Sequence, residues 1–422
     1  MAFNYEINQL ELMQARIKSV PHGWQFTYVG KAFCIRNNLR KPISEEERSM
    51  SPGNYPYYGP TKIQGYIGTF EQDGSYALIG EDGDHFLKFE KHSMTQLVDG
   101  KCTVNNHAHI IEGTKEASRE WFYYYFMHRD IFSFLSRQGA GRYKLNKASL
   151  EKMPLLLPPI VEQKKIAQIL STWDKAISVT EKLLANSQQQ KKALMQQLLT
   201  GKKRLLDENG VRFSGEWEYT IFGNLGDTYT GLTGKTKEDF GAGKPYIPYI
   251  NIFKNSRIDI QNLEYVQVND DERQSVVKYG DIFFTTSSET PEEVGMSSVL
   301  LEEVSEVFLN SFCFGFRLNN FETLIPKYAR YLFRSEHVRR QISTLGQGAT
   351  RYNLSKRQLI KLELKLPCVE EQQKIAAVLS AADAEISTLE KKLACLRDEK
   401  KALMQQLLTG KRRVKVDEAV AE

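Results

Sequence analysis

Two long segments of the chain carry apolar residues at alternating intervals of three and four positions. The first runs from Ile166 to Leu198 and the second from Ile375 to Leu407. This heptad spacing, held for four to five repeats, predicts two coiled-coil helices. The apolar seam positions are Ile166, Leu170, Trp173, Ile177, Leu184, Leu194 and Leu198 in the first segment, and Ile375, Leu379, Ile386, Leu389, Leu393, Leu396, Leu403 and Leu407 in the second.

Each predicted helix is followed by a glycine, Gly201 or Gly410, where a helix C-cap is expected. Because the two seams match and a whole domain separates them, we expect the helices to close on each other as an intramolecular antiparallel pair. Two alternatives stay open at this point. Each helix could instead pack on its own globule, or the rod could bind mainly to a partner subunit.

The remaining sequence alternates short strand-like runs with turn residues and one helical stretch per half. Residues 76–80, 103–104 and 280–284 belong to segments rich in β-branched and aromatic residues and broken by glycine and proline, which predicts short strands that end in turns. Helices are expected within 115–135 and 327–345. The predicted fold is α+β, with globules at 1–153 and 206–362 and long helices within 154–205 and 363–422.

The two halves are copies of one unit. The 12-residue string at 191–202 recurs letter for letter at 400–411, and 28 of the 48 positions in 158–205 are identical at the same offset of 209. A tandem duplication of this kind predicts a pseudo-two-fold molecule that engages something with two halves.

Composition describes an ordinary globular chain. Of its 422 residues 41% are hydrophobic, and its five cysteines are scattered, which favours neither a disulfide framework nor a zinc site. We expect a cytoplasmic protein without a membrane segment. The net charge is +5, and the basic excess lies in 151–205, with 10 basic and 4 acidic residues. This distribution suggests local basic surfaces rather than a general nucleic-acid coat.

Several motifs resemble one family. The phrase Pro-Pro-Ile-Val-Glu-Gln-Lys-Lys-Ile-Ala at 158–167, copied as Pro-Cys-Val-Glu-Glu-Gln-Gln-Lys-Ile-Ala at 367–376, is similar to the signature of type I restriction–modification specificity subunits. The Leu-Leu-Thr-Gly-Lys ending after each helix, the Gly-Asp-Ile-Phe-Phe segment at 280–284 and the Gly-Ala-x-Arg-Tyr loops at 139–143 and 348–352 also resemble theirs. The resemblance covers essentially the whole chain.

The resemblance implies a non-catalytic subunit that reads DNA. Each globule would be a target recognition domain for one half of a bipartite, asymmetric site on double-stranded DNA. The helices would set the spacer and dock two modification subunits. Those adenine-N6 methyltransferase subunits would carry S-adenosylmethionine, and restriction subunits would use ATP and Mg for translocation and cleavage. This chain itself would bind no cofactor or metal.

An enzyme remains the alternative: a single-chain methylase or nuclease with recognition modules. The sequence lacks an (Asp/Asn)-Pro-Pro-aromatic segment and a phosphate-binding Gly-x-x-x-x-Gly-Lys-Ser/Thr loop, which disfavours it. A scaffold without a DNA role is a third possibility. The aromatic run 121–126 is interpreted as a helix packed on a sheet. His107 and His109 are interpreted as part of a polar surface strand.

Candidate DNA contacts are loops that mix donors, glycine and aromatic residues, because base edges and phosphates are read by such donors. The loops that differ between the halves are the better candidates for sequence reading. The candidates are Asn54, Tyr57, Tyr58, Lys62, Gln138, Arg142, Tyr143 and Lys144 in the first globule, and Thr233, Lys235, Lys237, Tyr249, Asn251, Thr285, Thr286, Ser287, Ser288, Gln347, Arg351, Tyr352 and Asn353 in the second.

Overall fold

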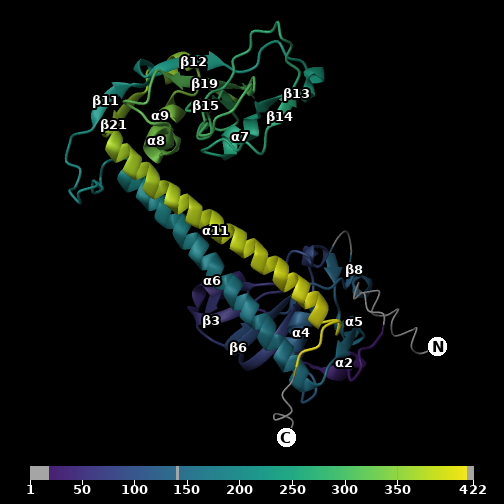
Figure 1. Cartoon of the computed structure of the whole chain (residues 1–422). Helices are drawn as coiled ribbons and strands as arrows, with labels where there is room; N and C mark the ends of the chain where they lie inside the picture. The colour runs from purple at the N-terminus through teal and green to yellow at the C-terminus, as the bar shows by residue number, and fades with distance from the viewer. Residues whose placement is uncertain (1–18, 139–141, 349, 416–422) are drawn as a thin grey trace. The chain divides into compact units, whose positions relative to one another are not determined.

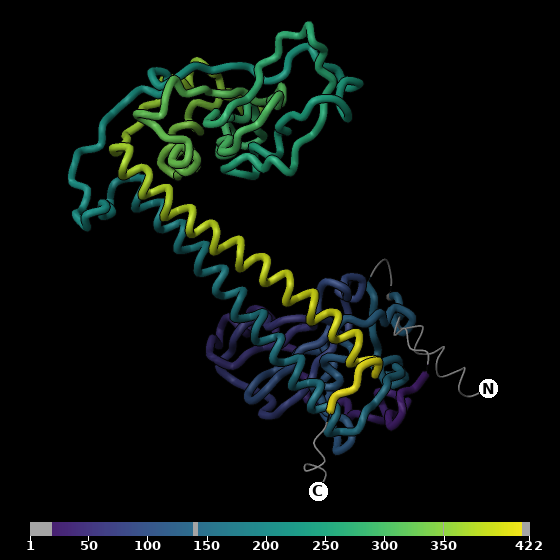
Figure 2. The backbone as a smooth tube through the Cα atoms, viewed as in Figure 1, coloured from purple at the N-terminus to yellow at the C-terminus, as the bar shows by residue number. Residues whose placement is uncertain are grey.

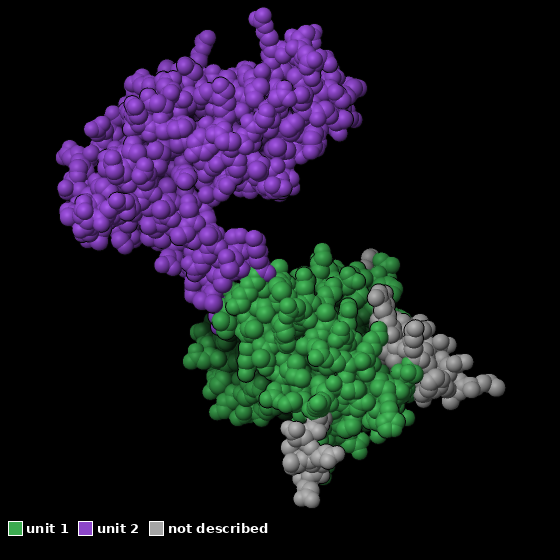
Figure 3. Space-filling view, viewed as in Figure 1, with its two compact units in different colours: residues 1–181, 392–422 green, residues 182–391 purple. Residues whose placement is uncertain are grey.

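The computed structural model describes residues 19–138, 142–348 and 350–415. The chain divides into two compact units, coloured separately in Figure 3. Unit 1 comprises residues 1–181 and 392–422, and unit 2 comprises residues 182–391. Each unit therefore consists of one globule, a part of the first long helix and a part of the second.

The two long helices are α6 (Ile160–Leu198) and α11 (Val369–Leu407). Within unit 1 the start of α6 lies beside the end of α11 (Figures 1 and 2), and Lys400 Nζ lies 2.5 Å from an Asp174 oxygen. Within unit 2 the end of α6 lies beside the start of α11, and Lys191 Nζ lies 2.5 Å from an Asp383 oxygen. Residue numbers rise along one helix as they fall along the other. The predicted antiparallel pairing is therefore confirmed within each unit.

Burial along both helices follows the heptad seam. All fifteen apolar seam residues are buried or half-buried, whereas most positions between them are exposed. Both helices end as the sequence predicts, because Gly201 and Gly410 adopt φ of +70° and +69°, a conformation that favours glycine. Their C-terminal turns also match: Lys203 N donates to Gln197 O, and Arg412 N donates to Gln406 O.

The globule of unit 1 is built on a six-stranded sheet of order β2-β7-β5-β6-β3-β4, in which only the β3–β6 pair is parallel. A separate antiparallel pair, β1–β10, leads into α6. The elements are β1 (Gln25–Tyr28), α2 (Val29–Ala32), β2 (Cys34–Ile35), η1 (Asn37–Leu39), α3 (Glu45–Met50), β3 (Pro52–Tyr58), β4 (Ile63–Ile67), β5 (Gln72–Gly80), η2 (Asp84–Lys88), β6 (Thr95–Val104), β7 (Ala108–Glu112), α4 (Arg119–Phe126), η3 (Phe132–Phe134), β8 (Ser136–Gln138), β9 (Arg142–Lys144), α5 (Lys147–Glu151) and β10 (Pro154–Leu157).

The globule of unit 2 has a four-stranded antiparallel sheet, β12-β19-β15-β17, and a three-stranded one, β14-β13-β18. Here the pair that leads into the long helix is β11–β21. The elements are β11 (Glu218–Ile221), η4 (Phe222–Asn224), β12 (Gly226–Thr230), η5 (Lys237–Asp239), β13 (Phe240–Ile247), α7 (Tyr249–Lys254), β14 (Glu264–Val266), β15 (Ile282–Thr285), β16 (Ser287–Ser288), β17 (Ser297–Val299), β18 (Phe308–Leu309), β19 (Cys313–Leu318), α8 (Pro326–Leu332), α9 (Glu336–Thr344), β20 (Tyr352–Asn353), α10 (Lys356–Leu359) and β21 (Glu363–Leu366).

The helical stretches of the globules are shorter than predicted. In unit 1 only α4 is α-helical within 115–135, and it is capped by Ser118, whose side chain accepts from Trp121 N. In unit 2 the stretch 327–345 contains two helices, because Ser335 caps the second one, α9, by accepting from Val338 N. The strands at 154–157 and 363–366, grouped with the long helices above, pair instead with the first strand of each globule.

The aromatic run of α4 packs into the core of unit 1, as predicted, with Trp121, Phe122, Tyr124, Tyr125 and Phe126 all buried. The interpretation of His109 is wrong. His109 lies on β7 and is buried rather than on a polar surface. His107, just before β7, is exposed, and its Nδ1 lies 2.9 Å from an Asp82 oxygen. Within the described residues, no helix combines the length and apolar character needed to span a membrane.

Candidate nucleic-acid interface

Each globule is attached to the long helices through a buried glutamate of the repeated motif at 158–167 or 367–376. In unit 1, Glu162 accepts a hydrogen bond from Trp24 Nε1 at 3.0 Å. Arg413, just beyond the end of α11, donates to both oxygens of the same carboxylate at 2.7 and 2.8 Å. A charge-assisted bidentate pair fixes orientation as well as distance. We call Trp24, Glu162 and Arg413 the unit 1 anchor.

The same arrangement recurs in unit 2. Glu371 accepts from Trp217 Nε1 at 3.3 Å and from Arg204 Nε and Nη2 at 2.6 and 2.7 Å. We call these three residues the unit 2 anchor. Arg204 follows α6 as Arg413 follows α11, so each globule holds the start of its own helix and the end of the other one. The strings repeated in sequence therefore build repeated joints.

The signature glutamine makes a second repeated joint. Gln163 Oε1 accepts from Ser118 N at 2.8 Å, and its Nε2 donates at 2.7 Å to the carbonyls of both Pro158 and Glu116. The side chain thus ties the start of α6 to the segment that precedes α4. The three bonds recur around Gln372, with partners Ile325, Pro367 and Thr323.

An aspartate on each long helix completes the repeated contacts. Asp174 accepts from Tyr124 Oη at 2.8 Å and pairs with Lys400, a seam position of the other helix. Its copy Asp383 accepts from Tyr331 Oη at 2.7 Å and pairs with Lys191. Lys191 and Lys400 are charged residues at seam positions that are otherwise mostly apolar. Each is paired with an aspartate of the other helix, which explains why a lysine fits there.

The Gly-Asp-Ile-Phe-Phe segment of unit 2 has a structural role. Gly280 has φ +85°, and a side chain there would meet Phe321. Asp281 is buried and accepts from Tyr229 Oη at 2.5 Å and from Arg317 Nε at 2.9 Å. The motif therefore secures the centre of the four-stranded sheet rather than forming a contact surface.

One end of that sheet gathers most unit 2 candidates. β12 and β15 both run antiparallel to β19, with Thr230 opposite Phe314 and Thr285 opposite Cys313. Three segments therefore leave the sheet at the same end, at 231–236, 286–296 and 310–312. β20 adds a fourth segment, residues 347–348 and 350–353, because Ser287 pairs with Asn353. We call these four segments, with Tyr249, the unit 2 face.

Hydrogen bonds join the segments of the unit 2 face. Tyr249 Oη donates to Ser287 O at 3.0 Å, and Leu354 N donates to Thr286 O at 2.7 Å. Burial raises the pKa of Tyr249, so its hydroxyl remains a neutral donor. The exposed candidates on this face are Thr233, Gln347, Arg351 and Asn353, with Thr286, Ser287 and Tyr352 half-buried beside them.

Other unit 2 candidates are placed differently. The amide of Asn251 is buried and donates to the carbonyls of Asp259 and Asn262, so the structure gives it an internal role rather than a DNA contact. The side chains of Thr285 and Ser288 are also buried. The Lys235 side chain is only 6% exposed and pairs with Glu272 at 2.6 Å, whereas Lys237 is exposed.

Two half-buried arginines of unit 2 bind backbone carbonyls in and next to the unit 2 face, and sequence analysis missed both. Arg339 donates to the carbonyls of Glu292, Val294 and Gly295, all in the 286–296 segment. Arg334 donates to the carbonyls of Ser297, Ile252, Phe253 and Asn255. Burial lowers the pKa of each to about 10, so both stay charged at neutral pH. The sequence shows only two arginines near a helix start, without their carbonyl partners.

Unit 1 assembles a different surface. Asn105 N donates to Tyr58 O at 3.0 Å, Glu81 N to His107 O at 2.8 Å, and Gly83 N to Tyr143 O at 3.1 Å. These bonds link the segments 58–62, 81–83, 105–107 and 142–144, which we call the unit 1 face. Lys62 and Arg142 are exposed on it, and Tyr58, Tyr143 and Lys144 are half-buried.

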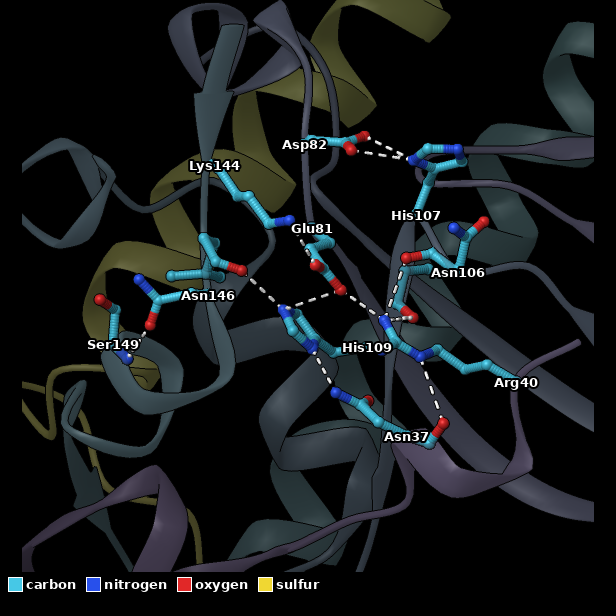
Figure 4. A network of polar contacts seen from close by, with 12 residues as sticks. Asn37, Arg40, Glu81, Asp82, Asn106, His107, His109, Lys144, Asn146 and Ser149 are labelled. Atoms are coloured by element: carbon cyan, nitrogen blue, oxygen red, sulfur yellow. Dashed lines mark hydrogen bonds and ion pairs between the residues drawn. The ribbon is translucent and has the colours of Figure 1, made fainter. Parts of the chain in front are cut away.

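A polar network underlies the unit 1 face (Figure 4). Arg40 and Lys144 both pair with Glu81, Lys144 at 3.1 Å. Burial alone raises the pKa of Glu81, but the hydrogen bonds from Arg40 and Lys144 bring it below its ordinary value. Buried His109 must be neutral, because Nε2 donates to Leu145 O at 2.7 Å while Nδ1 accepts from Asn37 at 2.8 Å. Desolvation also lowers its pKa.

The other unit 1 candidates are separate from this network. Asn54 is exposed near the start of β3. Tyr57 is buried, and its hydroxyl accepts from Ile43 N, so direct DNA contact is not supported for it. The backbone of Gln138 pairs with Arg142, but the Gln138 side chain and residues 139–141 of the predicted Gly-Ala-x-Arg-Tyr loop lie outside the described structure.

Comparison with known proteins identifies this arrangement. A model of the type I restriction modification DNA specificity domain matches the chain twice, over residues 21–186 and 215–396. A putative type I restriction enzyme specificity subunit of Haemophilus influenzae is 38% identical over 136 residues, covering 32% of this chain and 34% of that relative. A type I restriction enzyme specificity subunit of Methanocaldococcus jannaschii is 24% identical over 433 residues, covering 98% of each chain.

The fold agrees with the sequence matches. The crystal structure of a type I restriction–modification S subunit from M. genitalium superimposes with a TM-score of 0.59 over 93% of this chain and 96% of that one, at 14% identity. Two matches to the domain model, one per half, account for the duplication. The chain belongs to the family of type I restriction–modification DNA specificity subunits.

Proposed function

We propose that unit 1 and unit 2 each read one half of a bipartite, asymmetric DNA site. One observation carries this proposal: the two units share the same anchor to the long helices but present unlike polar faces. The unit 2 face presents Arg351, Gln347 and Asn353, and the unit 1 face presents Lys62 and Arg142. Arginine and amide side chains read base edges, and lysine positions the phosphate backbone.

The family supports a division of labour between this chain and its partners. We infer that two modification subunits dock on the repeated helices and joints, because two copies of one partner need two copies of one surface. Adenine-N6 methylation, with S-adenosylmethionine, would belong to those partners. ATP- and Mg-dependent translocation and cleavage would belong to restriction subunits. The chain's own residues would select the DNA and hold it.

The proposal is tested by mapping methylated adenines in cells that contain this chain and its modification partner. A two-part motif with unlike halves is expected, with half-sites about one helical turn, ~34 Å, apart. A single continuous motif or a palindrome would contradict one reading face per unit. Methyl transfer by the purified chain alone would instead favour the single-chain enzyme.

The helices give a second test of the same proposal. Deleting 182–188 and 386–392 together removes seven residues, about 10 Å of helix, from each rod. The gap between half-sites should shrink by about three base pairs while both half-site sequences persist. A changed half-site sequence would show that the helices do more than set the spacing.

A further inference from the structure

An exposed phenylalanine lies within the unit 2 face. Phe312 is 63% exposed and occupies the turn between β18 and β19. Single exposed apolar residues are common and need no explanation by themselves. The turn that carries Phe312 is held by several hydrogen bonds and adjoins candidate donors of the unit 2 face.

Backbone bonds fix the position of Phe312. Its N–H donates to Asn310 Oδ1 at 2.8 Å, and its carbonyl accepts from Thr286 N at 3.0 Å. Asn310 N in turn donates to Ile247 O at 3.1 Å. A side chain on Gly231 would come within 2.0 Å of Asn310 O, so this glycine allows the close approach. The exposed Phe312 ring therefore projects from a hydrogen-bonded turn at the end of the sheet where β12, β15 and β19 meet.

The surroundings of Phe312 are the donors proposed to read DNA. Thr286 N donates a hydrogen bond to the Phe312 carbonyl. Ser287, the next residue, pairs with Asn353 of the segment that contains Arg351. The Phe312 turn is thus hydrogen-bonded to a segment of the unit 2 face that carries candidate donors.

We propose that Phe312 is a specificity-determining residue that makes apolar contact with base pairs of the half-site read by unit 2. This inference rests on the proposed function and adds a residue and a chemistry to it. Duplex DNA offers two apolar features to such a ring. One is the thymine methyl group in the major groove, and the other is the face of a base at a partly unstacked step.

The chain supplies a matched control. Phe312 comes just before β19 and Phe321 comes shortly after it, so the two phenylalanines lie toward opposite ends of this strand. It is 40% exposed and contacts the Tyr279 ring at 5.8 Å between centroids, away from the unit 2 face. Phe321→Ala removes the same side chain without touching the proposed contact.

The test uses the full chain assembled with its modification subunits and a duplex carrying the mapped site. The measured quantity is the ratio of affinities for this duplex and for one with the unit 2 half-site scrambled. Phe312→Ala should lower that ratio about 10-fold, the size of one good base contact. Phe321→Ala should leave it unchanged, and Phe312→Leu should retain part of it.

Two modified duplexes distinguish the two apolar features. If the ring contacts a thymine methyl, replacing thymine by uracil in the half-site should weaken wild type but not Phe312→Ala. If it enters a base step, 2-aminopurine at that step should brighten with wild type only. A Phe312→Ala complex that discriminates as well as wild type would overturn the inference and leave the proposed function standing. A wild-type complex without discrimination would overturn the proposed function itself.

Discussion

Unit 1 and unit 2 are alike where the globules meet the long helices and unlike where they present their faces. Each anchor has a tryptophan, a buried glutamate and an arginine from the end of the other helix. Beneath the unit 1 face lies a network centred on Glu81, whereas the 286–296 segment of the unit 2 face is held by Arg339, which donates to three of its carbonyls. A duplicated frame can therefore keep its joints while each copy builds a different surface.

The largest predicted effect comes from removing the buried glutamate of an anchor. Glu371→Ala leaves Arg204, whose side chain is 19% exposed, without its partner and should destabilise unit 2 by about 3 kcal/mol. Glu162→Ala should cost unit 1 less, about 2 kcal/mol, because Arg413 is 44% exposed and solvent can replace the lost partner. Hydrogen exchange measured separately for peptides of each unit checks both values. Equal losses would show that exposure of the arginine does not matter.

Removing the signature glutamine should have a symmetric effect that is smaller than the effect of Glu371→Ala. Gln163→Ala and Gln372→Ala each leave one backbone N–H and two carbonyls without their glutamine partner, which should cost about 2 kcal/mol in the unit concerned. The same exchange measurement applies. Loss of protection in only one of the two variants would contradict the equivalence of the joints.

Acid should weaken unit 1 more than unit 2. Burial lowers the pKa of His85, His109 and His128, all in unit 1, so each binds a proton less readily in the folded state than in the unfolded state. Stability is then complete above the ordinary histidine pKa of about 6.5 and falls as the pH drops below it. Protection of unit 1 should therefore decline between pH 7 and pH 5.5. His109→Gln, which can accept and donate in the same places without titrating, should reduce the decline, and an unchanged profile would exclude His109 as a source.

The smallest predicted effect comes from the paired seam lysines. Lys400→Met and Lys191→Met each remove a partly exposed ion pair and add apolar surface to the seam, so each should change stability by less than about 1 kcal/mol. Thermal unfolding of the two variants checks this. A loss of several kcal/mol from either would give these ion pairs a larger part in holding the helices than their exposure indicates.

The long helices could be predicted because their information is local: a heptad seam and a C-cap glycine can be read from one segment. The faces depend on pairings between distant segments, such as the parallel β13–β18 pair, which no local pattern specifies. Residue type alone therefore made Tyr57, Asn251 and Thr285 candidates, although all three are buried. Phe312 was missed because it is apolar, and the sequence does not show that its side chain is exposed.

The most direct test alters one face and reads both half-sites. Gln347, Arg351 and Asn353 are exposed on the unit 2 face, and replacing all three by alanine leaves both anchors intact. Methylated adenines would then be mapped in cells carrying this variant and its modification partner. The account predicts that one half of the motif becomes degenerate while the other half and the spacer stay unchanged. Equal degeneration of both halves, or an unaltered motif, would contradict it.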